Sequence, residues 1–286
     1  MPHFKKPDWL KTSFSADGAY AQVKQIVDDH HLHTICTSGR CPNISDCWSR
    51  GTATMMILGD ICTRNCRFCN TITGKPLPPS EDEPEQVANS IHLMKLQHAV
   101  ITSVDRDDLP DLGANHWART IQAIKVKNPS ITLEVLIPDF QGRTDLLDLV
   151  IDAQPDIISH NLETVRRLTP VVRSAAKYEV SLSVLHHIAQ SGIVAKSGLM
   201  VGLGETREEM LETMDDLLKA GCTVLTIGQY LQPSRKNMEV AEYVTPEQFE
   251  QYRISALAKG FAMVESAPLV RSSYHAEKHI AATHRT

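Results

Sequence analysis

The chain has 286 residues, 42% of them hydrophobic and 22% charged, which is typical of soluble globular proteins and allows one large domain or two small ones. Its formal net charge of −5 gives no support to general nucleic-acid binding. No apolar stretch approaches the roughly 20 residues of a membrane-spanning helix, so we expect neither nucleic acid nor a membrane as a partner.

The N-terminal part of the chain is polar and contains the first of two groups of cysteines. Residues 1–33 lack the apolar core of a secretory signal, and residues 19–29 are predicted to form a helix. Cys36, Cys41 and Cys47 follow with the spacing C-x4-C-x5-C, which fits no common zinc finger. We expect residues 1–50 to form an N-terminal extension. Because clustered thiols indicate a reducing compartment, we expect the protein to be cytoplasmic.

A second cysteine group follows the apolar run at residues 53–59, which is predicted to be a strand. Its members, Cys62, Cys66 and Cys69, have the spacing C-x3-C-x2-C. Three thiolates can hold three irons of a cubane Fe–S cluster and leave the fourth iron open to a small molecule, whereas closed clusters in electron carriers usually have four thiolates. Zinc usually takes four ligands, and disulfides need an oxidising compartment. The pattern therefore favours an Fe–S cluster at which chemistry takes place.

From residue 52 onward, short apolar runs alternate with amphipathic stretches, which indicates βα units and a parallel sheet. Pro84 fits a helix start, and Pro129 fits a stop after a helix. Six repeats of about 30 residues predict an α/β fold with a partial (βα)6 TIM-type barrel over residues 51–264. The predicted strands are 53–59, 98–104, 132–137, 156–159, 195–202 and 223–229, and the predicted helices are 84–96, 114–127, 143–153, 162–168, 176–191, 206–220 and 246–259.

The last part of the chain, residues 265–286, is predicted to be a polar tail that contains Arg271-Ser272-Ser273-Tyr274. On their own, the two serines would be interpreted as an ordinary cap or turn. Cys222 stands alone at the start of an apolar run and is expected to be a buried structural thiol. Arg235 and Lys236 are either contacts for an acidic carrier or carboxylate, or solvated charges.

Taken together, the two cysteine triplets and the distant Arg271-Ser272-Ser273-Tyr274 resemble the lipoyl synthase family of radical S-adenosylmethionine (SAM) enzymes. The resemblance extends from about residue 33 to 276, without a departure at any metal-ligand position; Leu112 and Lys236-Asn237 are minor departures. Further matching segments are Gly51-Thr52-Ala53-Thr54, Ile57-Leu58-Gly59-Asp60, Val104-Asp105-Arg106-Asp107-Asp108-Leu109, Glu134-Val135-Leu136-Ile137-Pro138-Asp139-Phe140, His160-Asn161-Leu162-Glu163-Thr164-Val165 and Gly228-Gln229-Tyr230-Leu231-Gln232-Pro233.

This resemblance implies a radical SAM fold and two 4Fe–4S clusters. The cluster on Cys62, Cys66 and Cys69 would bind SAM at its open iron and cleave it to a 5′-deoxyadenosyl radical. The triplet Cys36, Cys41 and Cys47 would hold an auxiliary cluster that donates sulfur, with Ser273 as its fourth ligand. The implied reaction inserts sulfur at carbons 6 and 8 of an octanoyl-lysine on a carrier, either a lipoyl domain of a 2-oxoacid dehydrogenase acyltransferase subunit or the glycine-cleavage H protein. The implied reductant is a ferredoxin or a flavodoxin.

Candidate SAM contacts follow from the rule that parallel βα barrels gather their sites at the carboxyl ends of the strands. A helix cap, a structural hydrogen bond or core packing would explain each of them equally well. The candidates are Phe68, Thr102, Ser103, Asn161, Glu163 and Lys196.

Two other functions stay open at this point. One is a different two-cluster radical SAM enzyme in which the extra cluster only relays electrons. The other is a zinc-binding interaction module without catalysis, for which the cysteine spacings are less suitable.

Overall fold

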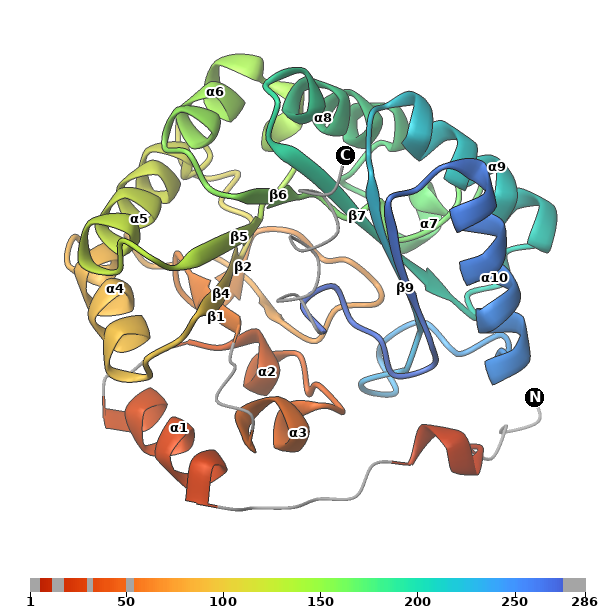
Figure 1. Cartoon of the computed structure of the whole chain (residues 1–286), viewed down its shortest axis with the longest axis horizontal. Coiled ribbons are helices and arrows are strands. Elements are labelled where there is room, and N and C mark those ends of the chain that lie inside the picture. The colour runs from red at the N-terminus through yellow and green to blue at the C-terminus, as the bar shows by residue number, and fades with distance from the viewer. Residues whose placement is uncertain (1–5, 12–17, 30–32, 50–53, 275–286) are drawn as a thin grey trace.

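Seven parallel strands form one curved sheet with the helices on its outer face, as Figure 1 shows for the computed structural model. The structure describes residues 6–11, 18–29, 33–49 and 54–274. The strand order is β1-β4-β5-β6-β7-β8-β9, so that β1 and β9 are the edges of the sheet. The strands are β1 (Thr54–Ile57), β4 (His98–Ser103), β5 (Thr132–Leu136), β6 (Ile157–Ser159), β7 (Val194–Val201), β8 (Val224–Gln229) and β9 (Met263–Ser266).

Two of the long helices begin where the sequence supplies a capping side chain. Thr206 and Glu209 form a capping box at the start of α9, and the Thr245 hydroxyl accepts from the Gln248 N–H before α10. The long helices of the barrel are α4 (Glu83–Leu93), α5 (Ala114–Lys127), α6 (Thr144–Asp152), α8 (Tyr178–Gln190), α9 (Arg207–Lys219) and α10 (Pro246–Lys259). Short elements are η1 (Asp8–Leu10), β2 (Ile61–Cys62), β3 (Ile72–Thr73), η2 (Phe140–Gly142) and α7 (Thr169–Val172).

The core lies between this outer layer of helices and the sheet. On α5, the side chains of Trp117, Ile121 and Ile124 are fully buried, in the same apolar cluster as Leu133 and Val135 of β5. Burying such apolar area is the main force that holds helices on a sheet. Among the described helices, none has the length and apolar character that crossing a bilayer requires.

The expected partial barrel is confirmed, with two differences in its elements. The seventh strand, β9, was not predicted, because its sequence Met263-Val264-Glu265-Ser266 has only two apolar residues. The helix predicted over 162–168 is wrong. Glu163 has a left-handed φ of 69°, its N–H donates to the Gly198 carbonyl, and its own carbonyl accepts from the Met200 N–H. Its backbone therefore pairs with β7. The first residue of the strand predicted at 53–59 lies outside the described residues.

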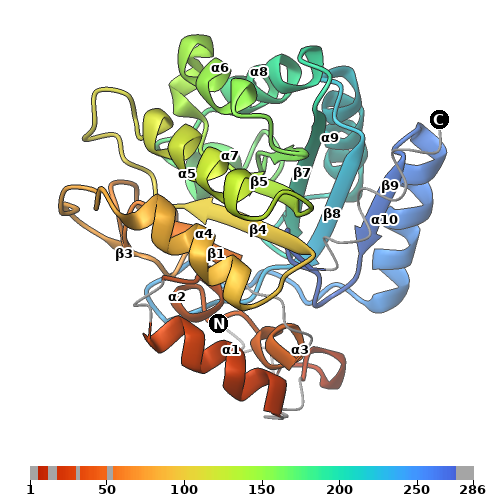
Figure 2. The same ribbon diagram turned by 60° about the vertical axis from the view of Figure 1, so that its left-hand side comes forward.

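The described N-terminal segment 33–49 meets the segment after β9 at the open side of the barrel, between the edge strands. The N-terminal helices α1 (Gly18–Asp29), α2 (Ile35–Ser38) and α3 (Ile44–Ser49) lie beside β1 (Figures 1 and 2). The Asn43 side chain of this segment donates to the Leu269 carbonyl at 2.7 Å. Gly228 of β8 lets the same C-terminal segment approach, because a Cβ there would collide with the Val270 carbonyl. The tail predicted at 265–286 is described as far as Tyr274, and β9 continues the sheet past its predicted start.

Candidate active site

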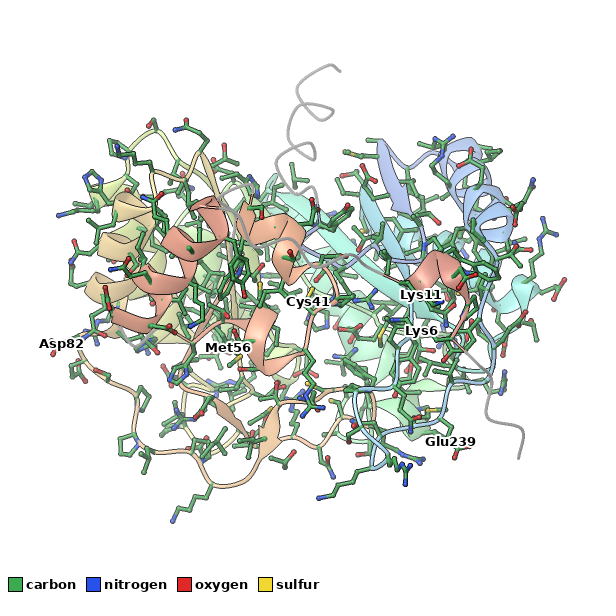
Figure 3. All side chains as sticks on the ribbon, turned by 90° about the horizontal axis from the view of Figure 1, so that it is seen from below. Lys6, Lys11, Cys41, Met56, Asp82 and Glu239 are labelled. Atoms are coloured by element: carbon green, nitrogen blue, oxygen red, sulfur yellow. The ribbon has the colours of Figure 1, made fainter. Side chains whose placement is uncertain are left out.

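A cavity of about 610 Å³ opens at the carboxyl ends of the strands, and both cysteine triplets reach it. Figure 3 shows Cys41 near the middle of the molecule, between Met56 of β1 and Lys6 of the N-terminal segment, all of which line the cavity. Cys47, which is half-buried in α3, is the one member of the two triplets that is not among the lining residues. Ser273 and the other five cysteines of the triplets line the cavity: Cys36, Cys41, Cys62, Cys66 and Cys69.

The cysteines are free thiols, which is the state from which a metal cluster can be bound. All seven cysteines lie within the described residues, and none of them forms a disulfide. Burial raises the pKa of Cys36 and of Cys62 to about 11, and that of Cys66 to about 12. Metal ligation needs thiolates, so loading this cavity must release protons. Within the described part of the chain, no three His, Cys, Asp or Glu side chains are gathered around a single-ion position.

The loop that carries the second triplet is built around Cys62. The Cys62 sulfur accepts from the backbone N–H groups of Arg64 and Asp105, at 3.4 and 3.3 Å. Its thiol also donates to the Asp105 carboxylate at 3.7 Å. Two amides aimed at one sulfur stabilise a thiolate, which is the form that binds iron. These amides offset part of the rise in the Cys62 pKa that burial and the Asp105 charge cause, so the loop is shaped to hold the thiolate once it forms.

Buried Arg64, inside this loop, holds three carboxylates from two other strand ends. Its guanidinium donates two hydrogen bonds to Asp107, at 2.7 and 2.8 Å, and two to Asp139, at 2.9 and 2.8 Å. Asp105 lies 3.3 Å away from the same group. Burial alone would raise the pKa of Asp139, but the hydrogen bonds from Arg64 outweigh it and lower this pKa to about 2. The cluster loop is thereby anchored to the ends of β4 and β5.

Five of the six predicted SAM contacts line the cavity: Phe68, Thr102, Ser103, Asn161 and Glu163. In the described structure the buried Ser103 hydroxyl and the buried Asn161 Oδ1 have no hydrogen-bond partner. Asn161 Oδ1 faces Gly198, where a Cβ would stand only 2.7 Å from it. Buried polar atoms without partners are costly, so their presence in a cavity fits a polar ligand such as SAM.

Glu163 is held beside these groups by the backbone conformation described above. Its carboxylate accepts from the Asn161 side-chain amide at 3.1 Å. Loss of hydration raises the pKa of Glu163, although the nearby positive charge of Arg173 opposes this. A carboxylate in such a place suits a cationic or hydroxyl-bearing ligand, which would restore part of the lost solvation.

Lys196 does not join the other predicted SAM contacts. It is absent from the described residues that line the cavity, and its side chain is fully buried. The ammonium donates to Glu134 Oε1 at 2.7 Å and to the Ser272 carbonyl at 2.6 Å. The structure therefore gives Lys196 a link between the barrel interior and the C-terminal segment.

The two cysteine segments are tied to each other as well as to the cavity. The Asn70 side chain, next to Cys69, donates to the Ser38 carbonyl of the first triplet at 2.9 Å. Arg271 is half-buried, and its positive charge opposes the stronger effect of burial, which raises the pKa of Cys41. Its guanidinium donates to the Val270 carbonyl at 2.7 Å. Ser273 thus stands in the same cavity as Cys36 and Cys41.

Sequence reasoning missed the charged groups that shape this site. Arg173, from the segment after α7, is buried at the cavity wall and donates to the Asn161 carbonyl at 3.1 Å. Asp105, Asp107 and Asp139 were noted only as parts of matching segments. A signal was present, because each follows the end of a predicted strand, where side chains of a parallel sheet gather.

The comparisons agree with this geometry. The chain matches the family model of the radical SAM superfamily over residues 56–217. It is 70% identical over 278 residues to the lipoyl synthase of Parabacteroides distasonis, which covers 97% of this chain and 99% of that protein. The lipoyl synthase of Treponema denticola is 60% identical over 276 residues, with coverage of 96% and 95%.

Solved structures of low sequence identity share the fold. Streptococcus suis SuiB bound to S-adenosylmethionine aligns with a TM-score of 0.59 over 77% of this chain and 54% of its own, at 9% identity. Methylornithine synthase (PylB) aligns with a TM-score of 0.53 over 90% of this chain and 80% of its own, at 10% identity. The chain belongs to the lipoyl synthase family of the radical SAM superfamily, enzymes that use SAM and 4Fe–4S clusters to insert sulfur into a protein-bound octanoyl group.

Proposed function

We propose that the two cysteine triplets divide the work of this enzyme between two clusters that face one cavity. Cys62, Cys66 and Cys69 would hold the cluster that binds SAM, which supplies a radical able to take hydrogen from an unactivated alkyl carbon. Cys36, Cys41, Cys47 and Ser273 would hold the cluster that supplies sulfur. The observation that carries this proposal is that five of these cysteines and Ser273 line the same cavity.

The residues of the cavity wall would bind and orient SAM. Ser103 and Asn161 offer polar atoms that have no partner in the described structure, and Glu163 offers a carboxylate beside them. Gly198 leaves the space that a side chain would otherwise fill. Thr102 has its hydroxyl engaged with the Leu136 carbonyl at 3.1 Å, so we assign it a contact through the rest of its side chain only. Phe68 is half-buried in the wall and is our candidate for packing against adenine.

Ser273 is the proposed ligand that makes the sulfur-donating cluster labile. A serine oxygen is a harder ligand than thiolate and suits a sulfide-rich iron site poorly, so it is the weakest of the four holds on that cluster. We propose that residues 1–50 and 265–286 are the extensions that build this second site, on either side of a barrel over 51–264. A Ser273→Cys variant that inserts the second sulfur as fast as the wild type would contradict this role.

We further propose that the octanoyl group arrives on lipoyl domains of 2-oxoacid dehydrogenase acyltransferase subunits or on the glycine-cleavage H protein. A ferredoxin or flavodoxin would supply electrons to the cluster on Cys62, Cys66 and Cys69. Family membership supports a protein-bound substrate, and a competition assay with the octanoylated carriers would rank them.

The test of the cluster assignment is a pair of cysteine variants after anaerobic reconstitution. The wild type should bind about eight irons per chain, as two cubanes require. Cys62→Ala should abolish SAM cleavage. Cys36→Ala should leave SAM cleavage intact and stop sulfur insertion. Labelled sulfide in the cluster on Cys36, Cys41 and Cys47 should appear in the product. Its absence would indicate that this cluster only relays electrons. A protein that binds only zinc would overturn the proposal altogether.

A further inference from the structure

Four exposed cations lie on or next to segments that line the cavity, and we refer to Arg40, Arg67, Arg235 and Lys236 as the basic rim. They come from three segments: the first cysteine triplet, the loop of the second triplet and the loop after β8. Arg40 donates to the Pro233 carbonyl at 3.4 Å, and the Arg67 carbonyl accepts from the Met238 N–H at 3.0 Å. These contacts hold the three segments side by side, next to Gln232 and Pro233 in the cavity wall.

These cations differ from most other exposed arginines of the protein. Arg119, Arg143, Arg166 and Arg167 each form an ion pair with a carboxylate. Within the described residues, no member of the basic rim has a carboxylate at ion-pair distance. Arg207 is the only other exposed arginine there that lacks such a carboxylate. The loop at residues 230–239 carries one acid, Glu239, against its two cations (Figure 3). A chain with a net charge of −5 therefore carries positive charge without paired carboxylates beside the segments that line its cavity.

The loop that presents Arg235 and Lys236 is already organised. The Asn237 side chain donates to the Cys69 carbonyl at 2.7 Å and accepts from the Ser234 hydroxyl at 2.7 Å. The Tyr230 hydroxyl donates to the Met238 carbonyl at 2.6 Å. A loop fixed in this way loses little conformational entropy when a partner binds, so its charges are effective contacts.

We propose that the basic rim is the docking surface for an acidic face of the carrier protein around its octanoyl-lysine. This inference rests on the proposed function, because it requires a protein-bound acyl chain that enters this cavity. The octanoyl-lysine side chain is short, so the surface of the carrier must contact the entrance of the cavity while the acyl chain lies inside it. A reductant needs only to approach the cluster of the second triplet, which leaves it other directions. Charge complementarity at a rim acts mainly on the association rate and gives binding a strong salt dependence.

The experiment compares two octanoylated substrates on the reconstituted holoenzyme: the intact carrier domain and a short neutral octanoyl-lysine peptide. In the R235E/K236E variant, the Kd and KM for the carrier domain should rise by about tenfold or more, and the salt dependence should weaken. The KM for the peptide and the rate of SAM cleavage should not change. The control K95E/K127E reverses two exposed lysines outside the rim and should behave as the wild type with both substrates.

The possible outcomes separate the docking surface from the activity itself. Unchanged carrier affinity in R235E/K236E would overturn the docking proposal. An equal loss with the peptide would also overturn it, because the charges would then act on the active site. So would a loss that appears only with a protein reductant and disappears with a chemical one. If the wild type converts neither substrate, the proposed function fails, whatever the variant does.

Discussion

The ammonium of Lys196 donates to the Ser272 carbonyl at 2.6 Å, which joins the middle of β7 to the residue before Ser273. The same ammonium pairs with Glu134 of β5 at 2.7 Å, and both side chains are fully buried. The Ser159 hydroxyl also donates to this carboxylate, at 2.8 Å. A charged pair inside the barrel thus fixes the C-terminal segment at the point where it reaches the cavity.

Neutralising this pair should weaken the binding of the sulfur-donating cluster without unfolding the chain. The single variant K196M leaves a buried carboxylate uncompensated and should lower the free energy of unfolding by about 3–5 kcal/mol. K196M/E134Q removes both charges and should recover much of this loss, while the Ser272 carbonyl still lacks its donor. A protein in which Cys62, Cys66 and Cys69 are replaced should still bind about four irons, in the sulfur-donating cluster. Adding K196M/E134Q to this protein should lower that number. Hydrogen exchange of residues 271–274 should be faster, and unchanged exchange with full iron would refute the role.

Arg64 should be essential for the loop of the second triplet. R64L leaves buried Asp139 and half-buried Asp107 without their partner, so the free energy of unfolding should fall by roughly 3–5 kcal/mol. Urea denaturation of the metal-free, reduced protein measures this. The matched control is R119L, which breaks the exposed pair of Arg119 with Glu81 and should cost less than about 1 kcal/mol. Comparable losses in the two variants would show that the buried network contributes nothing special.

His160 should make the folded state less stable in acid. Burial, and then the charge of Arg173, lower its pKa from 6.5 to about 4. Between these values the unfolded chain binds a proton that the native chain does not, so stability is full above pH 6.5 and falls as the pH drops toward 4. At about 1.36 kcal/mol per pH unit, the loss between pH 7 and pH 5 is about 2 kcal/mol. Urea denaturation at both pH values should show a smaller difference in H160Q, and an identical difference would be the contrary result.

Gly228 should be intolerant of even one added methyl group. In G228A the new Cβ would occupy the place of the Val270 carbonyl, so the C-terminal segment must move away from β8. We expect a loss of iron from the sulfur-donating cluster and faster proteolysis after residue 266. Gly18 provides the control, because nothing lies within 4 Å of a Cβ there, and G18A should be neutral or slightly stabilising at the start of α1. Normal iron content in G228A would mean that the segment can shift without consequence.

Most of the barrel could be predicted, because its buried strands and amphipathic helices are local patterns. The cysteine triplet at 62–69 is local too, and all three of its members line the cavity. The wrong helix at 162–168 has a different origin, since the pairing of Glu163 with β7 depends on a strand 36 residues further along, around Leu199. The role of Lys196 was missed for the same reason. Its partners Glu134 and Ser272 are 62 and 76 residues away, so no window of sequence contains them.

The contact between Asn43 and Leu269, 226 positions apart, also has a consequence for biogenesis. Chains emerge from the ribosome N-terminus first, so the cysteines at 36–47 wait through nearly all of synthesis before their proposed serine partner exists. The iron-delivery machinery would therefore meet a half-built pocket on every nascent polypeptide. A chain that stops before residue 273 would lack the proposed serine ligand and should retain its sulfur source less well.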